Sequence, residues 1–292
     1  MYLPYSYGVY LLFFTEYHSY RLGLLYRIIT AGRSFLVYMD HLKTQRHMIR
    51  IALFGVSFES DKEKELFLSS IEKAKKRAMM VAAVDVFVAC NTRENNPGYL
   101  GAVRLLMNHV DLGLYDYIII SNVDLTIEED FFIKLANYQC QEDIGWIAPQ
   151  IWSEKEKRDK NPRQTGRYSL LKLKLLRLGY QFPWLDTLYT KTLYKRKKMQ
   201  RKQPGYVYSG HGSFIILTKT YITRCGIVHY PVFLFCEEIY LAEQCLLAGL
   251  KVVYSPDIKI TDLEHISTGK MDHRTYCKYN LQAIDYIIRT FY

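Results

Sequence analysis

The feature of this sequence that most suggests chemistry is an apolar strand that ends in a carboxylate. Residues 118–120 are three consecutive isoleucines, a run typical of a strand covered on both faces of a parallel sheet. Asn122 and Asp124 follow it. Thr126 and Glu129 then have the spacing of a capping box, which predicts that a helix starts there. Asp124 is therefore expected at the carboxyl edge of a sheet, where open α/β folds bind ligands. The alternative is that Asn122 and Asp124 only shape the turn.

A second pair of acids stands at the start of a later helical pattern. Glu237 and Glu238 lie in "FLFCEEIYLAEQCLLAGL", ahead of apolar residues at helical spacing. Taken alone, two acids in a first helical turn are best explained as partners of the helix dipole. A catalytic role needs support from the rest of the chain.

The elements expected to position these acids alternate along the chain. "IRIALFGVSF" reads as a buried strand, and Ser60 with Glu63 predicts the cap of a helix with Phe67 and Ile71 on its buried face. "AVDVFVAC" is a second strand, "NTRENNPGYLGAVRLL" is a loop and helix, and "IGWIAPQI" is a strand beyond the Ile118 unit. This order predicts an α/β fold with a mostly parallel sheet flanked by helices and joined by right-handed crossovers.

Composition bounds the class of protein. At 292 residues and 49% hydrophobic content the chain can bury one sizeable core. It contains no run of eighteen apolar residues, and its "YGVYLLFF" start lacks the features of a signal peptide, so we expect a cytosolic protein. The six cysteines form no CxxC motif, and we expect no Cys/His pair at zinc spacing among them. We expect reduced, mostly buried thiols, without disulfides or structural zinc.

The positive charge is concentrated in one segment. Residues 154–202 hold sixteen Lys and Arg against four acids, a local charge of +12 against +10 for the whole chain, so the remainder carries about −2. This distribution favours a local contact surface on a near-neutral domain over a nucleic-acid binder, which usually carries its charge across a folded face. Residues 1–47 show little periodicity. They are either an extension upstream of a natural start at Met48 or an added helical layer, and we expect no catalytic residue in them.

Several quoted stretches, in this order, resemble family-2 glycosyltransferases of the GT-A fold, particularly the bacterial rhamnosyltransferase-like branch. "NNPGYLGAVR", which holds Asn96 and Gly98, looks like the branch's N-x-G-[FY]-x-[GA]-A element, and "IIISNVDLTIEEDFF" looks like its strand end and acidic helix start. "GYVYSGHGSFIIL" is similar to the loop before the acceptor site, "FLFCEEIYLAEQCLLAGLKVVYSP" to its acidic helix motif, and "DLEHIS" to its late histidine motif. The pieces cover about residues 49–268, and their order is more specific than any one of them.

The resemblance implies a Rossmann-like GT-A domain that uses a nucleotide-sugar donor. It makes Asp124 the ligand of a divalent cation, Mg²⁺ or Mn²⁺, that neutralises the leaving diphosphate, with Asn122 as its companion. His265 in "DLEHIS" would complete the metal or diphosphate shell. Glu238 matches the catalytic base of an inverting transfer, with Glu237 as the second candidate. The family usually has Asp at the position of Glu238, so Glu is a departure that lengthens the side chain by one methylene.

The donor-binding residues are less regular. The family commonly carries an Asp-Asn pair after the second strand, whereas "VACN" offers Cys90 and Asn91, which leaves recognition of the base open. Ser57 and Glu59, at the end of the first strand, are expected to supply further hydrogen bonds to the base. His211 and Ser213 in "SGHGS" either contact the sugar, because glycines allow a close approach, or form a turn.

The organisation expected from these arguments is an extension at 1–47, a GT-A domain at 48–268 with a basic insert at 154–202, and a C-terminal helical tail at 269–292. The insert, which includes Lys195, Arg196, Lys197 and Lys198, either lies on an anionic membrane or forms a helical pair over the acceptor cleft; its "LKLKL" also permits a short strand. The expected activity is transfer of a hexosyl or rhamnosyl group to a saccharide acceptor, lipid-linked if the membrane alternative holds, in surface polysaccharide synthesis. A nucleic-acid-binding protein and a catalytically inactive relative are the alternatives.

Overall fold

A computed structural model describes residues 10–12, 25–30, 33–35, 48–192, 203–263 and 271–292. The chain divides into two compact units, residues 1–47 and residues 48–292. The described part of the first unit is an antiparallel sheet of β1 (Tyr10–Leu12), β2 (Leu25–Thr30) and β3 (Arg33–Phe35). A helical layer is therefore wrong for these residues.

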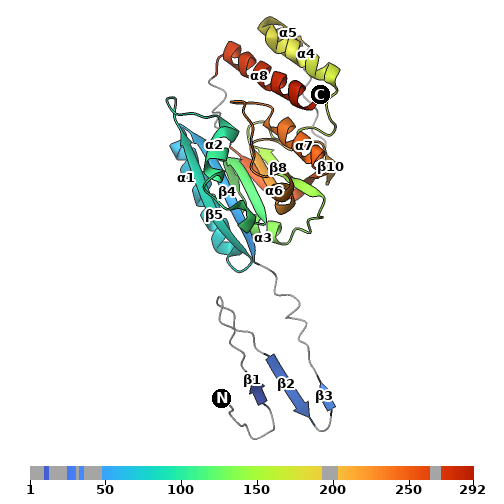
Figure 1. The fold of residues 1–292 in the computed structure, drawn as a ribbon. Coiled ribbons are helices and arrows are strands. Elements are labelled where there is room, and N and C mark those ends of the chain that lie inside the picture. Colours follow the sequence, from blue (N-terminus) through green and yellow to red (C-terminus); the bar gives the residue numbers. More distant parts are fainter. Residues whose placement is uncertain (1–9, 13–24, 31–32, 36–47, 193–202, 264–270) are drawn as a thin grey trace. The chain divides into compact units, whose positions relative to one another are not determined.

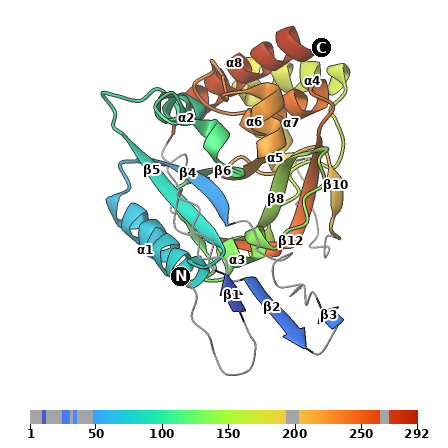
Figure 2. The ribbon, with the colours of Figure 1, turned by 60° about the horizontal axis from the view of Figure 1, so that its bottom comes forward.

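The second unit is built on one sheet of nine described strands, flanked by helices (Figures 1 and 2). The strands are β4 (Ile49–Phe58), β5 (Ala82–Asn91), β6 (Tyr117–Asn122), β7 (Leu125–Ile127), β8 (Ile144–Ser153), β9 (Arg158–Asp159), β10 (Gly205–Val207), β11 (Phe214–Thr218) and β12 (Lys251–Asp262). The helices are α1 (Asp61–Ala78), α2 (Tyr99–Met107), the 3-10 helix η2 (Leu112–Leu114), α3 (Phe131–Ala136), α4 (Leu170–Gln181), α5 (Pro183–Thr192), α6 (Lys219–Cys225), α7 (Glu237–Leu247) and α8 (His273–Phe291).

The strand order is β10-β12-β8-β11-β6-β4-β5, with β7 paired to β12 and β9 paired to β8. The pairs β4–β5, β4–β6 and β8–β12 are parallel, whereas β11 is antiparallel to both β6 and β8. The α/β class with a sheet between helices is confirmed, and its pairing is mixed. Because β11 runs against its neighbours, the loop before it reaches the edge at which β4, β5 and β6 end.

Alternating side chains of the strands build a core on each face of the sheet. In β4, Ile51 and Leu53 face the core that contains α1 and α3, while Ala52 and Phe54 face the core that contains α2, α6 and α7. The continuous apolar strands follow from this double burial, because neither face is left for water. Helices thus cover both faces of the sheet. The edge at which β4, β5 and β6 end is not covered by these two cores and can hold a ligand site.

Neither predicted capping box forms. Ser60 is the N-cap of α1, but its hydroxyl donates to the carbonyl of Phe58 at 2.7 Å and does not cap the helix. Thr126 lies in β7, opposite Thr261 of β12, and α3 begins later, at Phe131. Pairing with a strand distant in sequence has overridden the local helix signal, as tertiary contacts commonly do.

The C-terminal helix is part of the second unit. Asp272 caps α8 by accepting from the backbone N–H groups of Arg274 and Thr275, each at 3.0 Å. Ile284 and Ile287 are buried, and α8 packs along α4, as Figure 1 shows. No helix among the described residues is long and apolar enough to cross a membrane. The expectation of mostly buried thiols is correct for Cys245 and Cys277, whereas Cys90 is exposed and the other three cysteines are half-buried.

Candidate active site

A cleft of about 3410 Å³ opens at the carboxyl edge of the sheet. This volume exceeds the roughly 300–1,000 Å³ of a typical small-molecule site, so the cleft has room for two substrates. It is lined by nine of the residues predicted from the sequence: Glu59, Asn91, Asn96, Asn122, Asp124, His211, Ser213, Glu237 and Glu238. Ser57 and Gly98 lie outside this lining, and His265 lies outside the described residues.

Asp124 lies between β6 and β7, on the sheet side of the cleft. Its backbone carbonyl accepts a hydrogen bond from the N–H of Leu263 at 3.3 Å. The pKa of the Asp124 carboxyl is raised to about 6, mainly by burial and also by the nearby carboxylate of Asp262, while Lys160 opposes the shift. Lys160 Nζ itself pairs with Asp262 at 2.6 Å. This edge therefore holds two carboxylates and one cation.

The loop before β11 joins this edge to the opposite side of the cleft. The backbone N–H of Asn122 donates to the carbonyl of Ser213 at 2.9 Å. The N–H of Ser213 donates to Nδ1 of His211 at 3.2 Å, so a neutral ring carries its proton on Nε2. A Cβ atom placed on Gly212 would lie 3.7 Å from Oε2 of Glu238. One short loop is thus hydrogen-bonded to the strand end that precedes Asp124 and lies beside Glu238 of α7.

The two acids at the start of α7 have different surroundings. Glu237 is buried, and its Oε1 accepts from the N–H of Phe235 at 2.8 Å. Its pKa is raised to about 8, mainly by burial and also by the charge of Glu238. Oε1 of Glu238 lies 3.3 Å from Nε of Arg163, whose pKa is raised by this negative charge. Phe235 and Cys236 lead into the helix with φ values of +73° and +60°, a strained backbone that the surrounding packing must hold.

Most of the residues predicted to bind the donor nucleotide form hydrogen bonds or close contacts within their own loops. Nδ2 of Asn91 donates to Oδ1 of Asn96 at 3.1 Å, and the same oxygen accepts from the N–H of Gly98 at 3.0 Å. Gly98 has φ +83°, and a Cβ atom there would meet the carbonyl oxygen of Phe233 at 2.1 Å. Gly98 is thus required for the close approach of two loops. Glu59 lies at the cleft and pairs with Arg93 at 3.3 Å.

Four further residues belong to this site and are not among those predicted from the sequence. Tyr99, Lys160 and Arg163 line the cleft, and Asp262 lies behind Lys160 as its ion-pair partner. The hydroxyl of Tyr99 is buried with no hydrogen-bond partner among the described residues. Burial raises its pKa most, and the charges of Glu237 and Asp124 raise it further. It therefore lies within electrostatic reach of both acid groups. Asp262 is the first residue of the quoted "DLEHIS", and Tyr99 fills the [FY] position of the quoted N-x-G-[FY] element, so both could have been found there. No local pattern marks Lys160 or Arg163.

The described part of the basic insert contains a helical pair. The "LKLKL" stretch belongs to α4, so the short strand is wrong; Lys195, Arg196, Lys197 and Lys198 lie outside the described residues. Lys172, Leu173, Leu176 and Tyr180 of α4 and Asp186 of α5 line the cleft. Other apolar side chains of this segment are exposed: Leu171, Leu175, Leu178, Phe182, Trp184 and Leu188.

Comparisons with known proteins find likeness in structure only. No family model matches the chain, and no curated protein matches its sequence. Among solved structures, the chain is similar to the catalytic domain of Drosophila beta1,4galactosyltransferase 7 in complex with xylobiose, at TM-score 0.42 and 13% identity over 75% of this chain and 67% of that one. GalNAc-T7 with UDP, GalNAc and Mn²⁺ gives TM-score 0.49 and 10% identity over 77% of this chain and 45% of that one.

TarS of S. aureus gives TM-score 0.45 and 9% identity over 74% of this chain. The present chain spans 37% of TarS and 45% of GalNAc-T7, so it covers less than half of each of these two longer chains. At these identities and TM-scores the likeness assigns neither a reaction nor a substrate, which have to be argued from the site.

Proposed function

We propose that this protein is a GT-A glycosyltransferase that moves a sugar from a nucleotide-sugar donor to a saccharide acceptor. The observation that carries the proposal is that the Asp124 edge and the acids of α7 line one cleft and are joined through the short loop at residues 211–213. Glycosyl transfer needs such a pair of sites, one for the charge of the leaving diphosphate and one for the proton of the attacking hydroxyl.

The Asp124 edge fits a divalent cation bound together with a diphosphate. Asp262 is buried and Asp124 is half-buried, and their carboxylates are close enough to repel each other, so a cation between them and the donor would be stabilised. Mg²⁺ and Mn²⁺ prefer oxygen ligands, and Mg²⁺ is commonly held by one or two carboxylates plus substrate phosphates. When bound, the ion would neutralise charge on the leaving group. We propose His265 as a further ligand on the basis of the resemblance alone.

Glu238 is the proposed general base of an inverting transfer. It faces the cleft, is partly exposed to it, and its ion pair with Arg163 holds the carboxylate in place. Glu237 is held by the backbone N–H of Phe235 and has a pKa of about 8, so it carries a proton at neutral pH and is a poorer base there. We therefore propose Glu237 as a residue that positions Glu238.

Aromatic side chains on the other wall suit a saccharide acceptor. Phe233 packs on Tyr279 with ring centroids 4.9 Å apart, and Phe235 packs on Tyr276 at 5.1 Å; all four residues line the cleft. Sugar rings present apolar C–H faces that pack on aromatic rings, while the phenolic hydroxyls can meet sugar hydroxyls. These four residues are the proposed acceptor wall.

A lipid-linked acceptor, and with it a role in surface polysaccharide synthesis, is the finer proposal. It is supported by α4 and α5, where six exposed apolar side chains accompany Lys and Arg next to the acceptor side of the cleft. Such a surface suits peripheral binding to an anionic membrane on its cytoplasmic side. We also propose that the transferred sugar is a hexosyl or rhamnosyl group and that the protein is cytoplasmic. Ser57 and Glu59 are the proposed donor contacts.

The test is a thermal-shift panel of nucleoside-diphosphate sugars, with and without Mn²⁺, followed by assay of nucleoside-diphosphate release. We expect one donor class to raise the melting temperature in the presence of Mn²⁺ and to be hydrolysed slowly without an acceptor. Stabilisation by oligonucleotides but by no sugar nucleotide would favour the nucleic-acid-binding alternative. Metal-dependent donor binding without hydrolysis or transfer would favour a catalytically inactive relative.

A further inference from the structure

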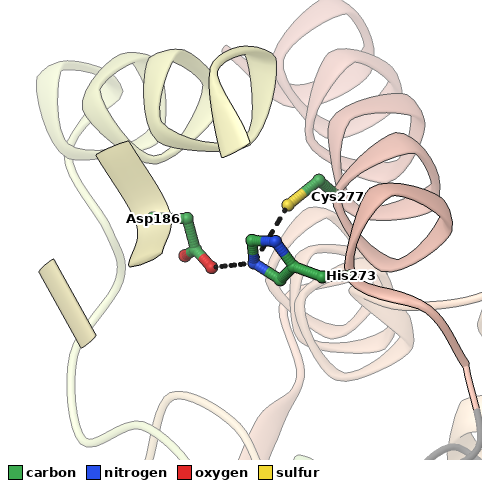
Figure 3. A group of neighbouring side chains, drawn as sticks. All are labelled: Asp186, His273 and Cys277. Atoms are coloured by element: carbon green, nitrogen blue, oxygen red, sulfur yellow. Dashed lines mark hydrogen bonds and ion pairs between the residues drawn. The ribbon is translucent and has the colours of Figure 1, made fainter. Parts of the chain in front are cut away.

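Three side chains with metal-binding atoms meet where α5 approaches α8 (Figure 3). They are Asp186 of α5 and His273 and Cys277 of α8, and their ligand atoms all lie within 4.8 Å of one another. Nε2 of His273 is 2.9 Å from Oδ2 of Asp186 and 3.6 Å from Sγ of Cys277. We call these three residues the α5–α8 cluster.

The local sequence explains half of this arrangement. His273 and Cys277 are four residues apart in α8, so their side chains lie on one face, one turn apart. The expectation of no Cys/His pair at zinc spacing overlooked this His-x₃-Cys spacing. Asp186 is added by the packing of α5 against α8, which no local pattern indicates.

The geometry argues against a nucleophilic triad. In a Cys-His-Asp triad the carboxylate binds one ring nitrogen and the nucleophile binds the other, so that the ring links the two. Here Asp186 and Cys277 both contact Nε2 of His273, and the thiol is 1% exposed. The ring cannot relay the effect of the carboxylate to the sulfur, and a substrate has little access to that sulfur.

The same convergence suits a metal ion. In tetrahedral zinc sites the metal is about 2.3 Å from sulfur and about 2.0–2.1 Å from nitrogen or oxygen, which separates neighbouring ligand atoms by roughly 3.3–3.6 Å. The Sγ–Nε2 distance of 3.6 Å has this value, and the Oδ2–Nε2 distance of 2.9 Å needs to lengthen by only a few tenths of an ångström. The third pair, a carboxylate oxygen of Asp186 and Sγ of Cys277, lies within 4.8 Å, and side-chain rotation has to bring it to this range on binding. His273 and Asp186 also line the cleft, so an ion has a path from solvent.

We propose that the α5–α8 cluster binds a transition-metal ion of the Zn²⁺ class through Oδ of Asp186, Nε2 of His273 and Sγ of Cys277. Sulfur and imidazole ligands select zinc or cobalt over magnesium and manganese, so this site is chemically distinct from the Asp124 edge. Three protein ligands leave one tetrahedral position for water or another ligand. Binding releases the thiol proton of Cys277 to solvent, because the thiolate is the ligand.

An ion here would stabilise the acceptor wall. The ring of His273 stacks on Tyr276 at 6.4 Å and 15°, and Tyr276 packs edge-on against Phe235 at 5.1 Å. Phe235 in turn holds the carboxyl of Glu237 through its backbone N–H. Joining α5 to α8 therefore restrains the side of the cleft that carries the proposed base, without a contact to the donor diphosphate.

The test is a titration of the reduced, metal-free full chain with Co²⁺, read as absorption. We expect one ion per chain with a near-ultraviolet sulfur-to-cobalt charge-transfer band, displaced by Zn²⁺. Cys277→Ser should abolish the band, and His273→Ala should weaken binding by more than about 100-fold, since outer-shell partners alone are worth about 10–100-fold. His273 is half-exposed, so its variant should fold; circular dichroism checks both proteins.

Two controls separate this site from the other features. Cys90→Ser, which removes the exposed cysteine, and Asp124→Asn, which alters the proposed donor edge, should both keep the band. Zn²⁺ should raise the melting temperature of the wild type but not that of His273→Ala. A band that persists in Cys277→Ser, or no band at all in the folded wild type, overturns the proposal, and neither result bears on sugar-nucleotide binding.

Discussion

Arg163 holds Glu238 by an ion pair, Nε to Oε1 at 3.3 Å, although the two residues are 75 positions apart in the chain. Glu237, the next residue, makes its contact with its own loop, through the N–H of Phe235. The two adjacent glutamates therefore differ in their surroundings. Glu238 forms an ion pair at the cleft, whereas Glu237 is buried and has a pKa of about 8. Their different environments are the physical basis for assigning them different roles.

Glu238→Gln should remove sugar transfer and keep donor binding. The amide preserves the shape of the side chain but cannot accept the proton of the acceptor hydroxyl, and loss of a general base costs on the order of 10²–10⁴-fold in rate. The measurement is the transfer rate at saturating acceptor beside the donor dissociation constant. Arg163→Gln is the companion variant, expected to slow transfer less because the carboxylate remains. Full transfer by Glu238→Gln would rule out Glu238 as the base.

Glu237 should make the protein less stable as pH rises. Its pKa is about 8 in the folded chain against an ordinary value of 4.5 for Glu, so between these values the folded state holds a proton that the unfolded state has lost. The stabilising contribution is complete below about pH 4.5 and is lost towards pH 8, with a slope of up to about 1.4 kcal/mol per pH unit. Urea unfolding from pH 5 to pH 8.5 should therefore show a steeper fall for the wild type than for Glu237→Gln. Parallel curves would contradict the buried, protonated carboxyl.

Asp124→Asn should abolish the metal dependence of donor binding while the fold is kept. The amide removes the negative charge that would hold the cation, and it fits the same space. Calorimetric titration with the sugar nucleotide, with and without Mn²⁺, measures the effect. Asp159→Asn, another acid of the cleft lining, serves as the matched control and should retain the Mn²⁺ effect. If Asp124→Asn still responds to Mn²⁺ as the wild type does, the cation is held elsewhere.

Gly98→Ala should destabilise the protein by more than backbone strain alone. The residue has φ +83°, and the added Cβ would lie 2.1 Å from the carbonyl oxygen of Phe233. Gly226→Ala is the matched control, because Gly226 has φ +73° and open space around its Cβ position. We expect Gly98→Ala to cost about 1–3 kcal/mol more than the control in denaturant unfolding, the range of overpacking. Equal losses would mean that the two loops separate easily.

Exposed apolar residues of α4 and α5 should promote membrane binding. Trp184 is 65% exposed and Leu175 is 61% exposed, which favours burial among lipid headgroups. The double variant Trp184→Ser, Leu175→Ser should sediment less with vesicles that contain anionic lipid. The same change at Met80 and Leu247, exposed residues distant from α4 in sequence, is the control. If neither double variant changes vesicle binding, α4 and α5 do not bind the membrane and serve only as a wall of the cleft.

The sequence by itself determined the elements and the edge at which they end. Apolar runs such as residues 118–120 have no polar face to offer water, so they must be covered on both sides, and alternation with helices then gives an α/β sheet. Parallel strands end together at one edge of a sheet, which is why the sequence alone places Asn91 and Asn122 at the same edge. The start of α7 at Glu237 likewise followed from local spacing.

Only the tertiary structure decided what these residues face. Thr126 joined a strand because β12, whose Thr261 lies 135 residues later, offered backbone hydrogen bonds that a local cap could not match. The roles of Glu237 and Glu238 depend on burial and on Arg163, and the α5–α8 cluster depends on the packing of two helices. Charge, burial and ligand geometry are set by neighbours distant in the chain, and a local pattern carries no information about them.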